Sequence, residues 1–128
     1  MLDRGECRSL LASRKVGRLA YCGAFGPRIV PLNYTLVDTF ILFRPVPASD
    51  AAREIPQRWV AFEVDDVDEF LRAGWSVEVR GFAELLPIGS IRMLDLPETP
   101  QPWRDGDHSL LIRVPLSNVT GRRVHASA

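Results

Sequence analysis

Two apolar-rich runs, residues 29–37 and 40–43, flank the polar pair Asp38 and Thr39. This pattern predicts a β-hairpin with a tight turn. In the first run alternate side chains fall on opposite faces. One face carries Val30, Leu32, Tyr34 and Leu36, and the other carries Ile29, Pro31, Asn33 and Thr35. Because both faces hold apolar residues, we expect a barrel strand that packs inside and also against something outside.

Arginines bracket this hairpin, with Arg28 before the first run and Arg44 after the second. Together with Asn33 in mid-strand, they suggest a ligand edge on an otherwise buried sheet. The other interpretation is that both arginines are ordinary charges at strand ends. The pattern alone leaves both interpretations open.

Similar alternation predicts further strands at residues 16–22, 59–64, 75–86, 108–114 and 119–124. Apolar stripes and capping residues predict helices at 3–13, 50–55 and 88–96, with Ser49 or Asp50 capping the second. Glycine and proline predict a turn at 23–27 and a loop at 97–107. The acids at 65–69 open one predicted helical turn that ends near residue 73, where they complement the helix dipole.

These elements predict a mainly β fold, an antiparallel barrel with short helices. The longest predicted strand should bend at Gly81. Residues 1–128 are expected to form one domain, with 125–128 as a frayed tail.

The composition of the chain excludes some classes of function. Sixteen basic and sixteen acidic residues cancel, so the chain lacks the basic field that non-specific nucleic-acid binding requires. It has no apolar run long enough to span a bilayer and no signal-peptide core, so we expect a cytoplasmic protein. Cys7 and Cys22 lack CxxC spacing and are expected to stay reduced.

Recognisable catalytic chemistry is missing from the sequence. It contains no G-x-S-x-G or P-loop motif, and its histidines, His108 and His125, have no zinc-ligand spacing. The four acids at 65–69 lack the calcium-loop pattern, so no metal is expected. If the domain does chemistry, a bound organic cofactor is expected to supply the reactivity.

The segments VGRLA, RIVPLNY, ILFR, VAFEVDD, GWSVEVRGFAE, PWRDGD and VTGRRV occur in this order from residue 16 to residue 124. In this the chain resembles the pyridoxamine 5'-phosphate oxidase-like family, the FMN-binding split barrels. The resemblance implies a six- to seven-stranded antiparallel split β-barrel with short flanking helices. It also implies a homodimer that holds flavin in a groove between its subunits and acts on a small-molecule redox substrate.

The resemblance also assigns roles to individual residues. The segment that would contact the flavin ring and phosphate consists of Arg28, Ile29, Val30, Pro31 and Asn33. The family's next strand end and phosphate turn are matched by Phe43, Arg44, Ser49 and Asp50. Near the C-terminus, Trp103 and Arg113 match a Trp and an Arg that reach the cofactor from the partner subunit.

Three departures from the family pattern bear on the cofactor. Asp50 stands where a basic residue is usual, Ala48 replaces a Gly, and Asn33 replaces a frequent Lys. A carboxylate about 5 Å from the nearly dianionic phosphate would repel it by several kcal/mol at an effective dielectric near 20. Arg28, Arg44 and Arg53 are the residues that could compensate.

Three hypotheses follow. The first is an FMN-dependent oxidoreductase-like homodimer in which Arg28, Arg44 and Ser49 bind the phosphate. The second, favoured by Asp50, is a split-barrel dimer that has lost flavin and serves as a non-catalytic binding or structural module. The third is a relative that holds deazaflavin or haem in the same groove, although the shortage of histidine weighs against haem.

Overall fold

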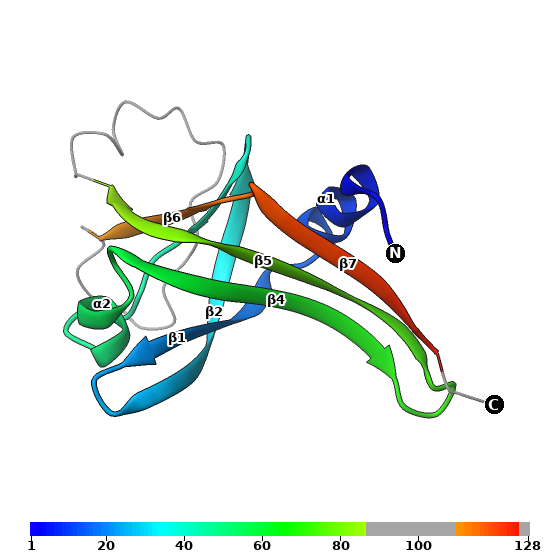
Figure 1. Ribbon diagram of the computed structural model, residues 1–128, viewed down its shortest axis with the longest axis horizontal. Helices are drawn as coiled ribbons and strands as arrows, with labels where there is room; N and C mark the ends of the chain where they lie inside the picture. The colour runs from blue at the N-terminus through cyan, green and yellow to red at the C-terminus, as the bar shows by residue number, and fades with distance from the viewer. Residues whose placement is uncertain (87–109, 126–128) are drawn as a thin grey trace.

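The computed structural model describes residues 1–86 and 110–125. In these residues the chain forms two helices and seven strands (Figure 1). The helices are α1 (Arg4–Ala12) and α2 (Asp50–Glu54). The strands are β1 (Val16–Gly23), β2 (Gly26–Val37), β3 (Phe40–Phe43), β4 (Arg58–Asp68), β5 (Ala73–Leu86), β6 (Leu111–Pro115) and β7 (Asn118–His125).

Six of these strands close into an antiparallel barrel. Hydrogen-bonded neighbours follow the order β4-β1-β2-β3-β6-β5, and an additional β4–β5 pairing closes the ring. β7 is the extra strand, paired with β5 outside the ring. The predicted mainly β, antiparallel barrel is confirmed. No helix within residues 1–86 and 110–125 is long and apolar enough to cross a membrane.

On one edge, β5 changes its neighbouring strand near Gly81, the position predicted for a bend. Residues Ala73 to Arg80 pair with β7, whereas Glu84 to Leu86 pair with β6. Gly81 lies at the change, where a Cβ atom would come within 3.0 Å of Val114 Cγ1 and 3.1 Å of the Pro115 carbonyl oxygen. A glycine at this position therefore lets β5 approach the neighbouring strand β6 closely.

The core lies inside the barrel and follows the predicted alternation of β2. Leu32 and Tyr34 are buried, whereas Ile29 is 67% exposed. The Tyr34 ring meets Phe62 edge to face, with centroids 4.8 Å apart, and its hydroxyl donates to the Leu11 carbonyl of α1. This hydrogen bond holds α1 against one end of the barrel.

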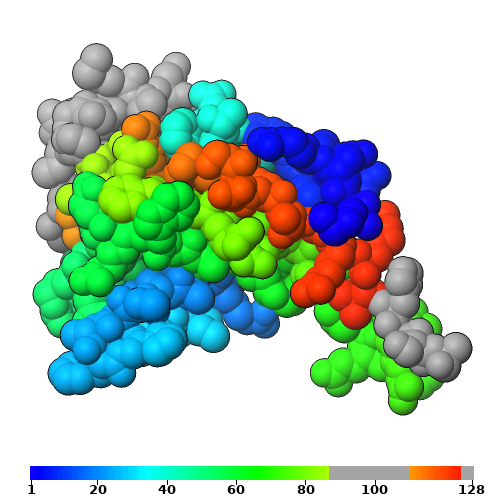
Figure 2. All heavy atoms as spheres, viewed as in Figure 1, coloured from blue at the N-terminus to red at the C-terminus, as the bar shows by residue number. Residues whose placement is uncertain are grey.

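The prediction of a helical turn after residue 64 is wrong. β4 continues to Asp68, and a tight turn leads directly into β5, so that the two strands form a long arm (Figures 1 and 2). The Asp68 carboxylate accepts the Leu71 N–H at 2.9 Å, and Arg72 takes a left-handed φ of 54°. Cross-strand pairing with β5 thus outweighs the local preference of the acids for a helix start.

Smaller differences concern the ends of elements. The turn predicted at 23–27 is shorter, because β1 runs to Gly23 and β2 resumes at Gly26. His125, predicted to be frayed, ends β7 opposite Ala73. The helix predicted at 88–96, the loop at 97–107 and the first two residues of the strand at 108–114 lie outside the described residues.

Candidate functional site

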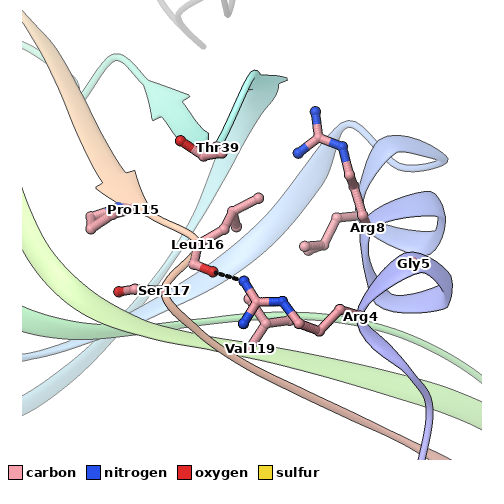
Figure 3. A pocket seen from close by; sticks show the side chains of 9 residues that line it. Arg4, Gly5, Arg8, Thr39, Pro115, Leu116, Ser117 and Val119 are labelled. Carbon is pink, nitrogen blue, oxygen red and sulfur yellow. Dashed lines mark hydrogen bonds between the residues drawn. The ribbon is translucent and has the colours of Figure 1, made fainter.

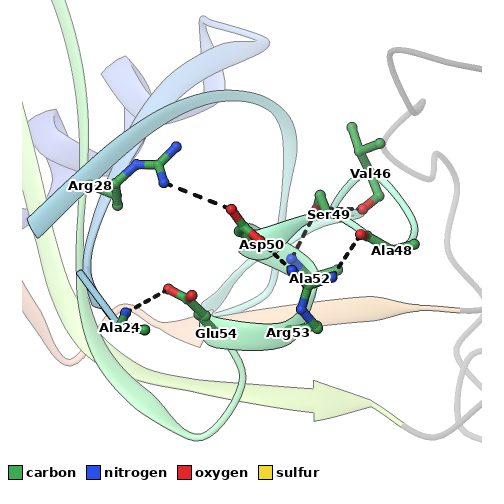
Figure 4. Close-up of polar contacts among 9 residues, drawn as sticks. All are labelled: Ala24, Arg28, Val46, Ala48, Ser49, Asp50, Ala52, Arg53 and Glu54. Atoms are coloured by element: carbon green, nitrogen blue, oxygen red, sulfur yellow. Dashed lines mark hydrogen bonds and ion pairs between the residues drawn. The ribbon is translucent and has the colours of Figure 1, made fainter. Parts of the chain in front are cut away.

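The candidate site forms where α2 packs against the turn between β1 and β2. The carboxylate of Glu54 accepts the backbone N–H of Ala24 at 3.2 Å, which fixes the helix to this turn. β2 starts directly after the turn, so Arg28 lies across from Asp50 (Figure 4). Two segments separated in sequence are thereby brought together.

Ser49 is the N-cap of α2, as one of the two predicted alternatives requires. Its hydroxyl oxygen accepts the Ala52 N–H at 3.1 Å and donates to the Val46 carbonyl. Ala48, just before it, has a φ of 60°, a left-handed conformation that glycine adopts without strain. The Gly expected here from the family pattern would therefore suit this backbone.

Asp50 is paired with two arginines. Its carboxylate forms an ion pair with Arg53 one helical turn later, and another with Arg28 of β2 at 3.9 Å. The Asp50 side chain is 54% exposed, and the two arginine side chains are 53% and 62% exposed. Arg53 also donates to the Ala48 carbonyl at 2.9 Å. The site therefore holds two guanidinium groups around one carboxylate, and these groups have more N–H donors than the Asp50 carboxylate uses.

Arg44 follows β3 on the path to α2. Its Nη1 donates to the Leu110 carbonyl at 3.5 Å, next to the start of β6. Of the predicted phosphate-binding residues, the structure thus brings Arg28 to Asp50, and Ser49 is next to Asp50 in the chain. Arg53, one of the three arginines expected to compensate for Asp50, pairs with it, and Arg44 lies on the connecting segment.

The predicted ring-contacting residues divide between two faces of β2. Val30 packs against the core, whereas Ile29 and Pro31 are exposed. Asn33 lies four residues beyond Ile29, paired in register with Val16. The exposed side belongs to a surface that we call the outer face. It consists of Ala20, Ile29, Pro31, Trp59, Ala61 and Phe82.

The outer face is apolar in its centre and charged at one side. Ile29 and Trp59 are each 67% exposed, and the Trp59 ring meets Phe82 edge to face at 6.1 Å. At the charged side, Arg18 pairs with Glu63 at 3.4 Å and with Asp65 at 3.2 Å. Burial, followed by the neighbouring Asp65 carboxylate, raises the pKa of Glu63 above its ordinary value.

Two predicted residues occupy other surroundings. Phe43 is fully buried in the core, which leaves only its backbone for a ligand. Arg113 pairs with Glu84 at 3.2 Å and stacks over the Phe40 ring at 4.5 Å. Trp103 lies outside the described residues.

Tyr21 is a residue that the sequence pattern did not single out. It is buried on the inner face of β1, in register with Arg28, and its hydroxyl has no hydrogen-bond partner among the described residues. An unpaired buried hydroxyl is uncommon in proteins. Alternation places Tyr21 inside like any core aromatic, so the sequence gives no signal for its unpaired hydroxyl.

Comparison with known proteins identifies a matching family model and similar proteins. A family model described as pyridoxamine 5'-phosphate oxidase matches residues 3–123. The uncharacterized protein Rv0080 of Mycobacterium tuberculosis is 32% identical over 99% of this chain and 86% of its own length.

Two solved structures share the fold at appreciable identity. An FAD-binding protein of Mycobacterium smegmatis has a TM-score of 0.81 and 29% identity, with 98% of each chain covered. An FAD-binding protein of Mesorhizobium loti has a TM-score of 0.75 and 26% identity, covering 98% of this chain and 96% of its own.

Proposed function

The chain belongs to the pyridoxamine 5'-phosphate oxidase family, and we propose that it binds a flavin nucleotide and acts as an oxidoreductase on a small molecule. The observation that carries this proposal is the convergence of Arg28 and Arg53 on the Asp50 carboxylate. Two guanidinium groups from different elements already hold an anion at this point. A flavin phosphate carries more charge than a carboxylate and makes the same kind of charge-assisted hydrogen bond.

The residues around α2 fit such a phosphate. Arg28 and Arg53 each present a planar fork of N–H donors, of which Asp50 uses only a part. Arg44 adds a third positive charge on the segment that leads into α2. In this proposal Arg28, Arg44 and Arg53 bind the phosphate, with Ser49 beside them, while Ile29, Val30, Pro31 and Asn33 of β2 line the ring. A bound flavin would supply hydride exchange, and the protein groups would orient it.

The proposal commits to a flavin phosphate, which FMN and FAD share. The family resemblance implies FMN, whereas the similar proteins from M. smegmatis and M. loti are described as FAD-binding. Both nucleotides carry a phosphate on the ribityl chain, which is a terminal monoester in FMN and half of a pyrophosphate in FAD. The binding experiment described below therefore titrates the protein with each nucleotide separately.

A homodimer is part of the same proposal. The outer face exposes Ile29 and Trp59, a large apolar surface for a single chain. Arg18 with its acidic partners places both signs of charge beside the apolar centre, so two copies can pair their charges reciprocally about a two-fold axis. We infer that a second copy covers this face. Trp59→Glu should then convert a dimer to a monomer in light scattering, whereas Phe70→Glu on the exposed β4–β5 turn should not.

The decisive experiment is the visible spectrum of the purified protein, followed by titration with FMN and with FAD. Yellow protein, or saturable binding at micromolar concentration that Arg28→Ala weakens, would support the proposal. A colourless protein that ignores both nucleotides would reject it. Dimeric protein with that second result would instead favour a non-catalytic binding or structural module, the alternative that Asp50 suggests.

A further inference from the structure

A cavity of about 460 Å³ lies between α1 and the turns that join β2 to β3 and β6 to β7 (Figure 3). Its volume is within the range of small-molecule sites in proteins. None of the residues proposed to hold flavin lines it. It is lined by Arg4, Arg8, Leu11, Pro115, Leu116 and Val119, together with Gly5, Thr39 and Ser117.

The walls of this cavity are mainly aliphatic. Leu11 of α1 is fully buried, and Leu116 of the β6–β7 turn is 7% exposed. Pro115 and Val119 extend the same apolar surface along β6 and β7. The two leucines are already shielded from water, so the apolar surface that a ligand would cover is that of Pro115 and Val119, which are half-buried. Such a surface favours a ligand with an apolar body, because contact removes both apolar surfaces from water.

Two arginines give the cavity a positive charge. Arg4 and Arg8 are four residues apart on α1 and therefore lie on the same side of the helix. The Nη2 atom of Arg4 donates to the Leu116 carbonyl at 3.1 Å, which holds its guanidinium against the cavity. Arg8 has no ion-pair partner in the described part of the chain, and no carboxylate from that part lines the cavity.

We propose that this cavity binds a small carboxylic acid with an apolar body. The carboxylate accepts two parallel hydrogen bonds from the Arg8 guanidinium, with Arg4 contributing a further donor. The apolar body lies against Leu11, Leu116 and Val119. This site goes beyond the proposed flavin function and does not depend on it, because the two share no residues.

Decanoate is the probe, titrated by calorimetry into the full-length protein both as purified and after saturation with flavin. We expect one saturable site per chain in both forms. Arg8→Ala should weaken decanoate binding by about tenfold or more, and Arg8→Lys by less, because it keeps the charge but loses the fork. Arg123→Ala, an exposed arginine outside the cavity, should change the affinity less than about twofold.

A second variant tests the cavity without removing charge. Gly5 lies in its wall, and a Cβ atom there would meet nothing closer than Asp3 Oδ1 at 3.4 Å. Gly5→Leu should reduce the cavity and abolish decanoate binding while raising the thermal midpoint, because leucine favours a helix more than glycine does. Folding can therefore be monitored independently of binding.

Three results would overturn this proposal. They are the absence of saturable decanoate binding at millimolar concentration, equal binding by the Arg8→Ala variant, and equal binding of decanol, which lacks the charge. Naphthoate provides the comparison for an aromatic body and should compete with decanoate at the same site. Failure of flavin to bind would remove only the flavin-saturated titration and would leave the measurements on the protein as purified unchanged.

Discussion

Replacement of Asp50 by Asn is expected to tighten flavin binding. At about 5 Å, a carboxylate repels a phosphate dianion by about 2 kcal/mol in bulk water and by about 7 kcal/mol at an effective dielectric near 20. The Asp50 side chain is 54% exposed, so the lower figure applies. About 2 kcal/mol corresponds to roughly 30-fold in affinity. The variant also frees donors on Arg28 and Arg53 that Asp50 now occupies.

The assay is a fluorescence titration of FMN and FAD at low and high salt. The gain in affinity should shrink with salt, because the charges involved are partly exposed. Glu69→Gln changes the net charge equally on the turn between β4 and β5, at the other end of β4 from α2, and should leave the affinity unchanged (Figure 1). The fold should survive, since exposed ion pairs contribute at most about 1 kcal/mol. Equal affinities for wild type and Asp50→Asn would refute the placement of the phosphate beside Asp50.

Three further predictions concern the barrel itself. Ellman's reagent should modify one thiol per native chain, that of the exposed Cys22. Cys7 should react only in denaturant, because it is 1% exposed and burial raises the pKa of its thiol. Rapid modification of two thiols in the native protein would contradict this. Gly17→Ala should lower the free energy of unfolding in urea by about 1–3 kcal/mol, since its Cβ would lie 2.3 Å from Phe62 Cζ; an unchanged free energy would show that the ring has room to move. Burial raises the pKa of Tyr34 to about 12, so the folded state keeps a proton that the unfolded state loses above pH 10. Stability should therefore fall by about 2–3 kcal/mol as the pH rises from 10 to 12, and Tyr34→Phe should flatten that part of the curve, whereas an identical slope would argue against it.

Alternating side chains were sufficient to predict most of the barrel. In β2 and β5 one face packs inside the barrel, so buried and more exposed residues alternate along the sequence with a period of two. The pattern failed after residue 64, where the acids resemble a helix start. There, Arg14 pairs with Asp66, and Arg18 pairs with Asp65. These arginines come from far earlier in the chain, so local sequence could not reveal that the acids belong to a strand.

The candidate site depended even more on contacts distant in sequence. The pairing of Arg28 with Asp50 exists because Glu54 binds the backbone of Ala24 and thereby holds α2 against the β1–β2 turn. A single glutamate in a five-residue helix carries no recognisable signal of this docking. Family resemblance named Arg28 and Asp50 as site residues, but only the fold shows that they contact one another.

This contact changes the meaning of Asp50. In the sequence it is an acid where a base is expected, which suggests that a phosphate would be excluded. In the structure it neutralises one of the two arginines that converge on it, so Arg28, Asp50 and Arg53 together keep one positive charge. A flavin phosphate would thus compete with an internal carboxylate for the same donors, so Asp50 would set the affinity rather than forbid binding. If this is correct, Asp50→Asn and Arg28→Ala must change flavin affinity in opposite directions. If the protein is instead a flavin-free module, both substitutions will be silent while the dimer persists.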